Sequence, residues 1–319
     1  MYNEEVKTRF IREYTKSISR AETCVQAFEA MSEFENLWGA DFCTKSADEL
    51  SPVIERLVGF RSRSKWQRII IFQKYVKWCI SNNIDGACDG MLQIEDVGLS
   101  KVRSQMVANP TQLQMYLNVI CEPESEQTTD NIYRCFYWMA YSGMDEESIL
   151  SVRSSDVDFE NMVIRSGGNE YEIYREAIPA IRNATNLTEF VYKHPNYPPD
   201  KIVRRNRAPG DTLMRGIRAT ASAPALRVEL SRRSKRFVED GLTDKQLSHY
   251  RVWLSGLFYR MYQREMAGIP VDFSGEAARF MEGKTYKLDT GRNTAEAKKR
   301  AVVNDYLQDY ERWKAAFQI

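Results

Sequence analysis

The chain has 319 residues, a formal net charge of +1 and 43% hydrophobic residues. This length predicts about two domains. No run approaches the roughly 18 apolar residues of a membrane helix, so we expect no membrane partner. The six cysteines show no CxxC spacing, which favours reduced thiols in a cytosolic protein. With two histidines in the chain, we expect no metal site and no cofactor.

The first 83 residues predict a small helical domain. Apolar periodicity indicates helices near 4–16, 19–38, 47–58 and 63–82. In the fourth, Phe72, Val76 and Cys79 belong to one apolar stripe, while basic residues project from the other side. Such a helix can pack on a bundle and turn its basic face toward DNA. Residues 84–100, with three glycines, four acidic residues and no basic ones, predict a linker.

A second domain is expected over 101–319, mostly helical with a small β-sheet. Its predicted helices near the start lie at 111–121, 128–142 and 146–153. Strand-like patterns at 162–165 and 171–178 predict a hairpin, and the Pro-rich, basic interval 193–213 an exposed loop. One further helix should start at Pro224, and a separate helix should include Trp253. An amphipathic helix is expected at the C-terminal end. We expect this last helix to pack on its own domain; donation to a neighbouring protomer is the alternative.

Basic residues concentrate in two blocks. Seven lie between Arg56 and Lys77 without any acidic residue, and the interval 201–236 has a local balance of +9. Two basic blocks in a near-neutral chain fit a DNA clamp, because phosphate neutralisation supplies most non-specific affinity. Solvated charged faces are the alternative. The residues that we expect to contact DNA are Arg63, Lys65, Arg68, Lys74, Lys77, Arg204, Arg205, Arg207, Arg232, Arg233, Lys235 and Arg251.

Residues 133–159 read YRCFYWMAYSGMDEESILSVRSSDVDF. A core-facing helix ends at Gly143, a short apolar helix follows, and Asp156 and Asp158 precede the hairpin. This pattern resembles the helix, tight Gly turn, helix and D-x-D entry of the tyrosine recombinase (phage integrase) catalytic domain. The four helices of residues 1–83 similarly resemble the core-binding domain of that family. The resemblance implies two domains that close around duplex DNA.

The resemblance also places the family's catalytic groups on this chain, and most are replaced. The first arginine falls on Asp145, whose carboxylate would repel a phosphate. The hairpin segment RSGGNEY holds no lysine, and Arg165 at its edge cannot donate a proton at neutral pH. The H-x-x-R box falls on 248–251, where Arg251 keeps the arginine, Ser248 stands for the histidine and His249 is displaced by one position.

The last two groups are replaced as well. The resemblance puts Lys284 where the family has histidine or tryptophan, and Asn293 where the nucleophilic tyrosine stands. Tyr306 lies in the amphipathic C-terminal helix, which favours a packing role. We therefore expect a protein that is not an enzyme, with no catalytic residues.

A recombinase scaffold without this chemistry resembles the MrpR family, the lytic-cycle repressors of SPbeta-type phages. The resemblance implies a sequence-specific double-stranded DNA-binding protein that represses transcription at operator repeats and maintains lysogeny. It would act in the bacterial host cytoplasm, associated with the nucleoid; self-association on DNA and a regulatory protein partner are left open. The alternatives are a divergent but active recombinase, with Arg153, Lys284 and Tyr306 as substitutes, and an interaction scaffold that does not bind DNA.

Overall fold

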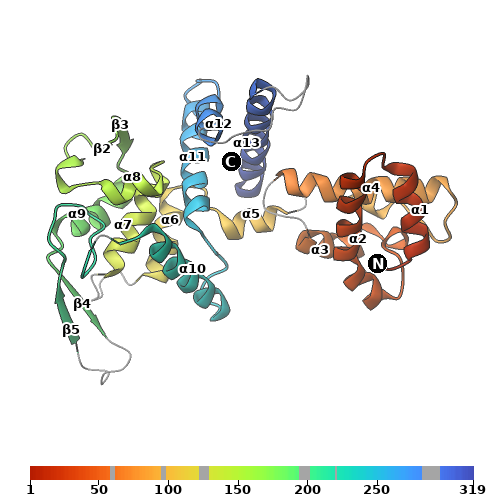
Figure 1. Cartoon of the computed structure of the whole chain (residues 1–319), viewed down its shortest axis with the longest axis horizontal. Helices are drawn as coiled ribbons and strands as arrows, with labels where there is room; N and C mark the ends of the chain where they lie inside the picture. Colours follow the sequence, from red (N-terminus) through yellow and green to blue (C-terminus); the bar gives the residue numbers. More distant parts are fainter. Residues whose placement is uncertain (58–61, 95–97, 122–128, 194–201, 220, 282–294) are drawn as a thin grey trace. The chain divides into compact units, whose positions relative to one another are not determined.

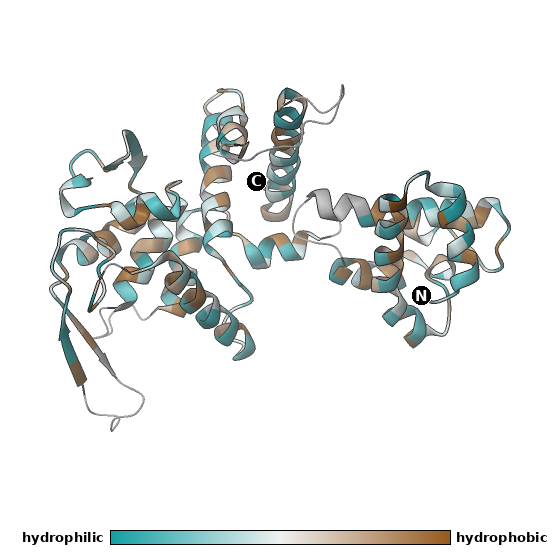
Figure 2. Cartoon of the chain, viewed as in Figure 1, coloured by the Kyte–Doolittle hydropathy of each residue, from teal (hydrophilic) through white to brown (hydrophobic). Residues whose placement is uncertain are grey.

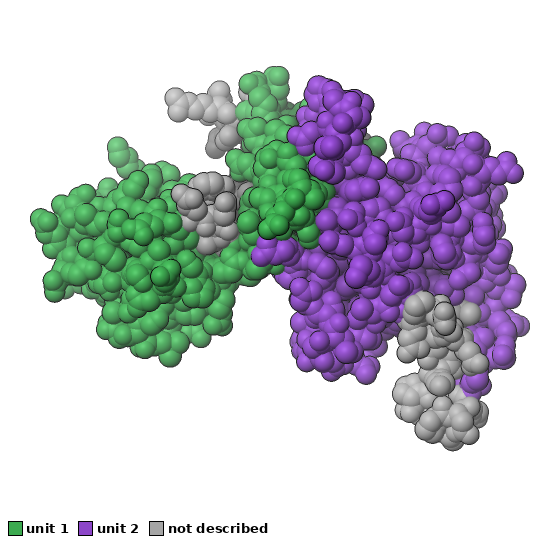
Figure 3. All heavy atoms as spheres, turned by 180° about the vertical axis from the view of Figure 1, so that it is seen from behind, with its two compact units in different colours: residues 1–102, 273–319 green, residues 103–272 purple. Residues whose placement is uncertain are grey.

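The computed structural model describes the chain except residues 58–61, 95–97, 122–128, 194–201, 220 and 282–294. Two compact units are present: Met1–Val102 with Phe273–Ile319, and Arg103–Asp272 (Figure 3). The described residues form mostly α-helices, with one three-stranded and one two-stranded antiparallel sheet (Figure 1). The predicted fold class, mostly α with a small β-sheet, is confirmed.

The first unit is helical. Its elements are α1 (Glu4–Tyr14), α2 (Ile18–Trp38), η1 (Phe42–Thr44), α3 (Ala47–Leu57), α4 (Ser62–Ser81), η2 (Gly90–Leu92), α12 (Ser274–Met281) and α13 (Ala295–Phe317). The first four α-helices lie within two residues of the predicted ranges, because their apolar spacing and caps are local signals. One such signal is the capping box before α3, where the Glu49 carboxylate accepts from the Ser46 backbone N–H at 3.0 Å.

Aromatic rings fill the core of this unit. Phe28 lies 5.0 Å from Tyr75 between ring centroids, and Phe42 lies 5.1 Å from Phe72. The segment predicted as a linker contributes to the same core, since Met91 and Ile94 are buried there. This segment is therefore part of the core, although its glycines and acidic residues predicted a linker.

The C-terminal segment groups with the first unit rather than with Arg103–Asp272. Phe273 stacks on Tyr306 of α13 at 5.6 Å, and its centroid lies 5.9 Å from that of Tyr310. Trp313 is also fully buried. The predicted amphipathic stripe of this helix is therefore a packing surface.

The second unit carries both sheets. Its helices are α6 (Pro110–Ile120), α7 (Thr129–Tyr141), α8 (Glu146–Ser151), α9 (Ile178–Asn186), α10 (Ala223–Glu239) and α11 (His249–Met266); α5 (Leu99–Gln105) includes the point where the chain enters this unit. Its strands are β1 (Val157–Asp158), β2 (Val163–Ser166), β3 (Asn169–Glu172), β4 (Glu189–Lys193) and β5 (Ile202–Asn206). The order β1-β2-β3 makes one sheet, with Ile164 opposite Tyr171, and β4 pairs with β5.

Two sequence-based expectations in this unit were wrong. The strand expected over 171–178 stops at Glu172, and Pro179 lies in the first turn of α9, where its missing N–H costs nothing. The interval 193–213 is not a loop throughout, because 202–206 is a strand paired with β4. The two strands extend from the helices of their unit as a ribbon (Figure 1).

Helix α7 is the central element of the second unit. Its residues from Cys135 to Tyr141 are all nearly inaccessible, and they lie against α11. The two backbones approach so closely that a Cβ on Gly256 would lie 1.8 Å from the Tyr141 carbonyl oxygen. Gly143 ends α7 with φ +101°, and the Met144 N–H donates back to the Met139 carbonyl, as the predicted glycine turn requires.

Within the described residues, every helix is too short or too polar to span a bilayer. The same residues contain no group of three His, Cys, Asp or Glu side chains placed to hold a metal ion. All six cysteines are free thiols.

Candidate nucleic-acid interface

Helix α4 presents lysines on the side opposite its buried stripe. Lys74 and Lys77 are exposed, whereas Phe72, Val76 and Cys79 are fully buried. The Lys74 ammonium lies 5.0 Å from the centroid of the Tyr14 ring, which holds its aliphatic stem against α1. Both lysines therefore keep their charge at the surface.

The other candidates on this helix differ. Arg68 is half-buried and donates to the Leu57 carbonyl, so it joins the ends of α3 and α4. The side chains of Arg63 and Lys65 lie outside the described residues.

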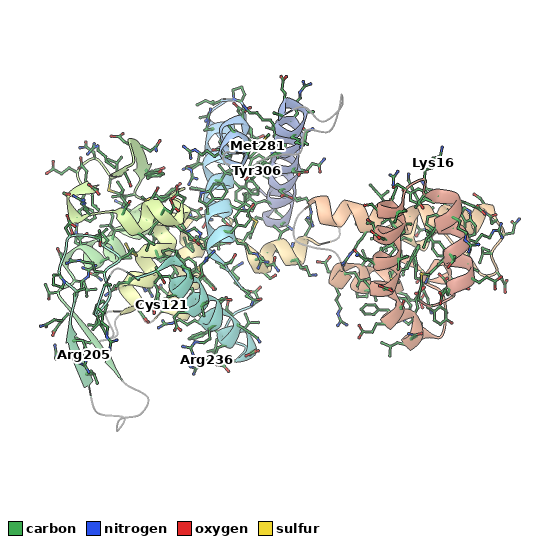
Figure 4. All side chains as sticks on the ribbon, viewed as in Figure 1. Lys16, Cys121, Arg205, Arg236, Met281 and Tyr306 are labelled. Atoms are coloured by element: carbon green, nitrogen blue, oxygen red, sulfur yellow. The ribbon has the colours of Figure 1, made fainter. Side chains whose placement is uncertain are left out.

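The β4–β5 ribbon carries two exposed arginines. Arg204 donates to Glu189 across the ribbon at 2.5 Å, and Arg205 is exposed (Figure 4). An antiparallel two-stranded ribbon has the dimensions of an element that enters the DNA major groove. Its place on a strand of this ribbon makes Arg205 a stronger candidate for a DNA contact than the loop predicted from the sequence would.

Arg207, two residues further on, is not a surface residue. Its guanidinium is buried and donates to the carbonyls of Ala184 at 2.8 Å and Leu187 at 2.9 Å, and to that of Leu213. Burial lowers the pKa of Arg207 to about 10. Because these carbonyls occupy its donors, we remove Arg207 from the set expected to contact phosphate.

Helix α10 separates its apolar and basic residues by helical periodicity. Leu226 and Leu230 are buried, whereas Arg232 and Lys235 are exposed. The colouring by hydropathy shows both kinds of residue along the helix (Figure 2). Arg232 pairs with Glu229 at 3.0 Å, and Lys235 with Glu239 at 3.6 Å. Ion pairs this exposed are weak, so a phosphate can replace the carboxylate.

Arg233 on the same helix has a different role. It contacts Asp130 at 2.7 Å and Glu229 at 2.9 Å, and its guanidinium lies 4.5 Å from the Tyr133 ring centroid. With only a fifth of its side chain exposed, it ties α10 to α7. We therefore correct its assignment from a DNA contact to a structural ion pair.

A groove of about 750 Å³ runs beside α10, between it and the start of α11. Its walls include Glu146, Arg227, Val228, Lys235, His249 and Tyr250. Arg227 pairs with Glu146 at 3.3 Å, and Val228 is 69% exposed. Arg227 and the exposed Arg236 were not among the predicted contacts. For Arg236, its position four residues after Arg232 on one helix could have indicated a shared face.

The positions that resemble the altered catalytic boxes have structural roles here. Asp145 is the N-cap of α8 and accepts from the Ser148 N–H at 2.7 Å. Ser248 is the N-cap of α11, with the Arg251 N–H at 3.4 Å. Asp and Ser are both favoured at N-caps because their oxygens satisfy unpaired helix donors.

The neighbouring groups are largely enclosed. His249 packs on Phe136 with ring centroids 4.8 Å apart, and burial lowers its pKa to about 4. Arg251 donates to the Gln246 carbonyl at 3.1 Å, and burial lowers its pKa. Tyr306 is 3% exposed. Lys284 and Asn293 lie outside the described residues.

Residues 1–81 match the family model described as the MrpR N-terminal core-binding domain. For this similarity, residues 1–81 are called the MrpR-type domain below. The resemblance inferred from the sequence is thus confirmed for this part of the chain. Of the candidate contacts, the exposed Lys74 and Lys77 lie in the MrpR-type domain, whereas those of the ribbon and of α10 lie outside it.

Most of the chain is similar to solved structures that include a recombinase and an integrase. It is 13% identical to XerA recombinase, covering 82% of this chain and 84% of that one, with a TM-score of 0.36. It is 11% identical to the Tn1549 transposon integrase in complex with circular intermediate DNA, covering 93% and 98%, with a TM-score of 0.35. No curated protein sequence matches the chain.

Proposed function

We propose that this chain is a sequence-specific double-stranded DNA-binding protein, a phage repressor that maintains lysogeny on a recombinase scaffold without the cleavage chemistry. The observation that carries the proposal is the presence of exposed basic side chains in each unit, one of which contains an MrpR-type domain. These side chains are Lys74 and Lys77 in the first unit, and Arg205, Arg232 and Lys235 in the second.

Phosphate binding supplies the affinity in this proposal. The exposed lysines and arginines release counterions when they neutralise phosphates, so affinity should fall steeply with salt. Phosphate contacts fix the register, while base edges specify the sequence. In the second unit, the β4–β5 ribbon and α10 carry the exposed basic residues named above, and the major groove admits both a two-stranded ribbon and an α-helix.

Two features support binding without cleavage. At the position that resembles the first catalytic arginine, Asp145 would repel a phosphate, and its cap on α8 gives that carboxylate a structural use. Tyr306, which would be the nucleophile if the chain were an active recombinase, is buried and stacks on Phe273. A protein with these residues would occupy an operator in the host cytoplasm without cutting it.

The deciding experiment selects bound duplexes from a random library at physiological salt. The enriched duplexes are then tested for a covalent protein–DNA adduct. Enrichment of one sequence without an adduct on a nicked suicide substrate supports the repressor. An adduct that disappears in Tyr306→Phe would show an active recombinase instead. Failure to enrich any duplex, with affinity that does not respond to salt, would favour an interaction scaffold.

Charge variants locate the surface. Arg205→Gln, Arg232→Gln and Lys235→Gln together should weaken binding to all duplexes and reduce the slope of log affinity against log salt by about three. Arg264→Gln is the control for one charge, since it removes an exposed charge about 22 Å along α11 from the groove. Equal losses of affinity per charge removed would mean that net charge, not this surface, determines binding.

A further inference from the structure

The MrpR-type domain encloses an ionic cluster that includes none of the proposed DNA contacts. The Lys7 ammonium on α1 donates to both carboxylate oxygens of Glu35 on α2, at 2.5 and 2.6 Å. It also lies 3.9 Å from the Asp41 carboxylate, just before η1. Lys7 and Glu35 are fully buried, and Asp41 is 6% exposed.

Hydrogen bonds complete the shell around the two carboxylates. The Tyr75 hydroxyl donates to Asp41 Oδ2 at 2.7 Å, and the Asn3 amide donates to the same oxygen at 3.0 Å. The Cys43 N–H donates to Asp41 Oδ1 at 3.0 Å. Glu35 receives one further donor, the Phe42 N–H at 3.1 Å. Groups from α1, α2, η1 and α4 therefore meet at one point.

The cluster contains one cation and two carboxylates. The other titratable groups that face it are phenols and thiols. Burial and Asp41 raise the pKa of the Tyr75 phenol, the Tyr2 ring centroid lies 5.9 Å from the Lys7 ammonium, and Cys43 and Cys79 are thiols. With both carboxylates ionised, the core would hold an uncompensated negative charge. Such a charge is costly to bury, and uptake of a proton removes the cost.

We propose that the cluster takes up one proton on Glu35 near neutral pH, so that the stability of the MrpR-type domain depends on proton binding. Glu35 is the better acceptor of the two carboxylates because it is the more deeply buried one and, besides its two bonds from Lys7, only the Phe42 N–H stabilises its charged form. Asp41 is partly exposed and accepts from three donors that remain when Lys7 pairs with Glu35. This inference does not depend on the proposed repressor function.

The direction of the pH effect follows from the burial of Glu35. Burial raises its pKa from 4.5 to about 7; the Lys7 ammonium opposes this rise, and the neighbouring Asp41 charge adds to it. A folded-state pKa above the unfolded value means that the folded domain binds more protons between those values. The contribution of Glu35 to the stability of the domain should be fully present below about pH 4.5. It should be lost as pH rises through 7. A folded-state pKa of about 7 against 4.5 corresponds to about 300-fold in the folding equilibrium.

Amide hydrogen exchange of the full-length protein, read by mass spectrometry on peptides from α1 and α2, tests the proposal between pH 5 and 8. After correction for the intrinsic exchange rate, protection of the wild type should fall up to about 100-fold over this range. Protection of Glu35→Gln, which keeps the shape but cannot titrate, should stay level. Glu33→Gln is the matched control, because Glu33 is exposed on the same helix.

An identical pH profile in the wild type and Glu35→Gln would overturn the proposal. Carbon NMR of the glutamate carboxyls in the wild type gives a second readout that requires no variant. One carboxyl that titrates near pH 7 supports the proposal. Titration of all glutamates below about pH 5.5 would overturn it.

Discussion

Arg205 and Arg207 lie two residues apart at the end of β5, and the structure gives them opposite surroundings. In Arg207→Ala, the carbonyls of Ala184, Leu187 and Leu213 lose a buried donor. An unsatisfied buried polar group costs about 1 to 3 kcal/mol, so three of them predict a loss of at least about 3 kcal/mol in the free energy of unfolding. Arg205→Ala should change stability by less than about 0.5 kcal/mol, since its side chain is exposed.

The two variants should also separate in DNA binding. Arg205→Ala should lower affinity for every duplex and reduce the salt slope by about one. Arg207→Ala, measured where it remains folded, should bind like the wild type. Urea denaturation and fluorescence anisotropy titrations measure the two quantities. Full stability of Arg207→Ala, or weaker DNA binding without loss of stability, would refute the assignment of Arg207 to the interior.

Three further outcomes are expected in the second unit. Gly256→Ala should lose at least about 2 kcal/mol of stability despite better helix propensity, because its Cβ would lie 1.8 Å from the Tyr141 carbonyl. Gly275→Ala is the control, because its Cβ meets open space and should not lower stability. Equal melting temperatures for the two variants would contradict the close approach of α7 and α11. Asp145→Ala should cost about 1 kcal/mol through loss of the α8 cap, and Asp145→Asn should restore most of it in chemical denaturation. The lowered pKa of His249 means that the unfolded chain binds more protons between pH 4 and 6.5, so stability should fall with acidification by up to about 3 kcal/mol. His249→Phe should reduce that loss in denaturant titrations at pH 4.5 and 7; an unchanged pH profile would argue against a buried neutral imidazole.

Much of the secondary structure could be read from the sequence because its signals are local. Apolar spacing predicted α1 to α4 within two residues, and the glycine at 143 predicted the end of α7. The resemblance of residues 1–83 to a core-binding domain also came from helical patterning, and the family match over residues 1–81 confirms it. These features depend on neighbours within a few turns of the chain.

The partner of a charged side chain, by contrast, depends on residues far away in the sequence. Arg232 and Arg233 are adjacent, yet only the second meets Asp130, about a hundred positions earlier. The sequence around Lys7 is likewise that of an amphipathic helix with a surface lysine. Only the fold brings both Glu35 carboxylate oxygens against its ammonium. The sequence by itself determined where the helices lie and where basic residues concentrate. The tertiary structure alone decided which of those charges face solvent, because burial and ion pairing are set by contacts between elements that the local pattern does not specify.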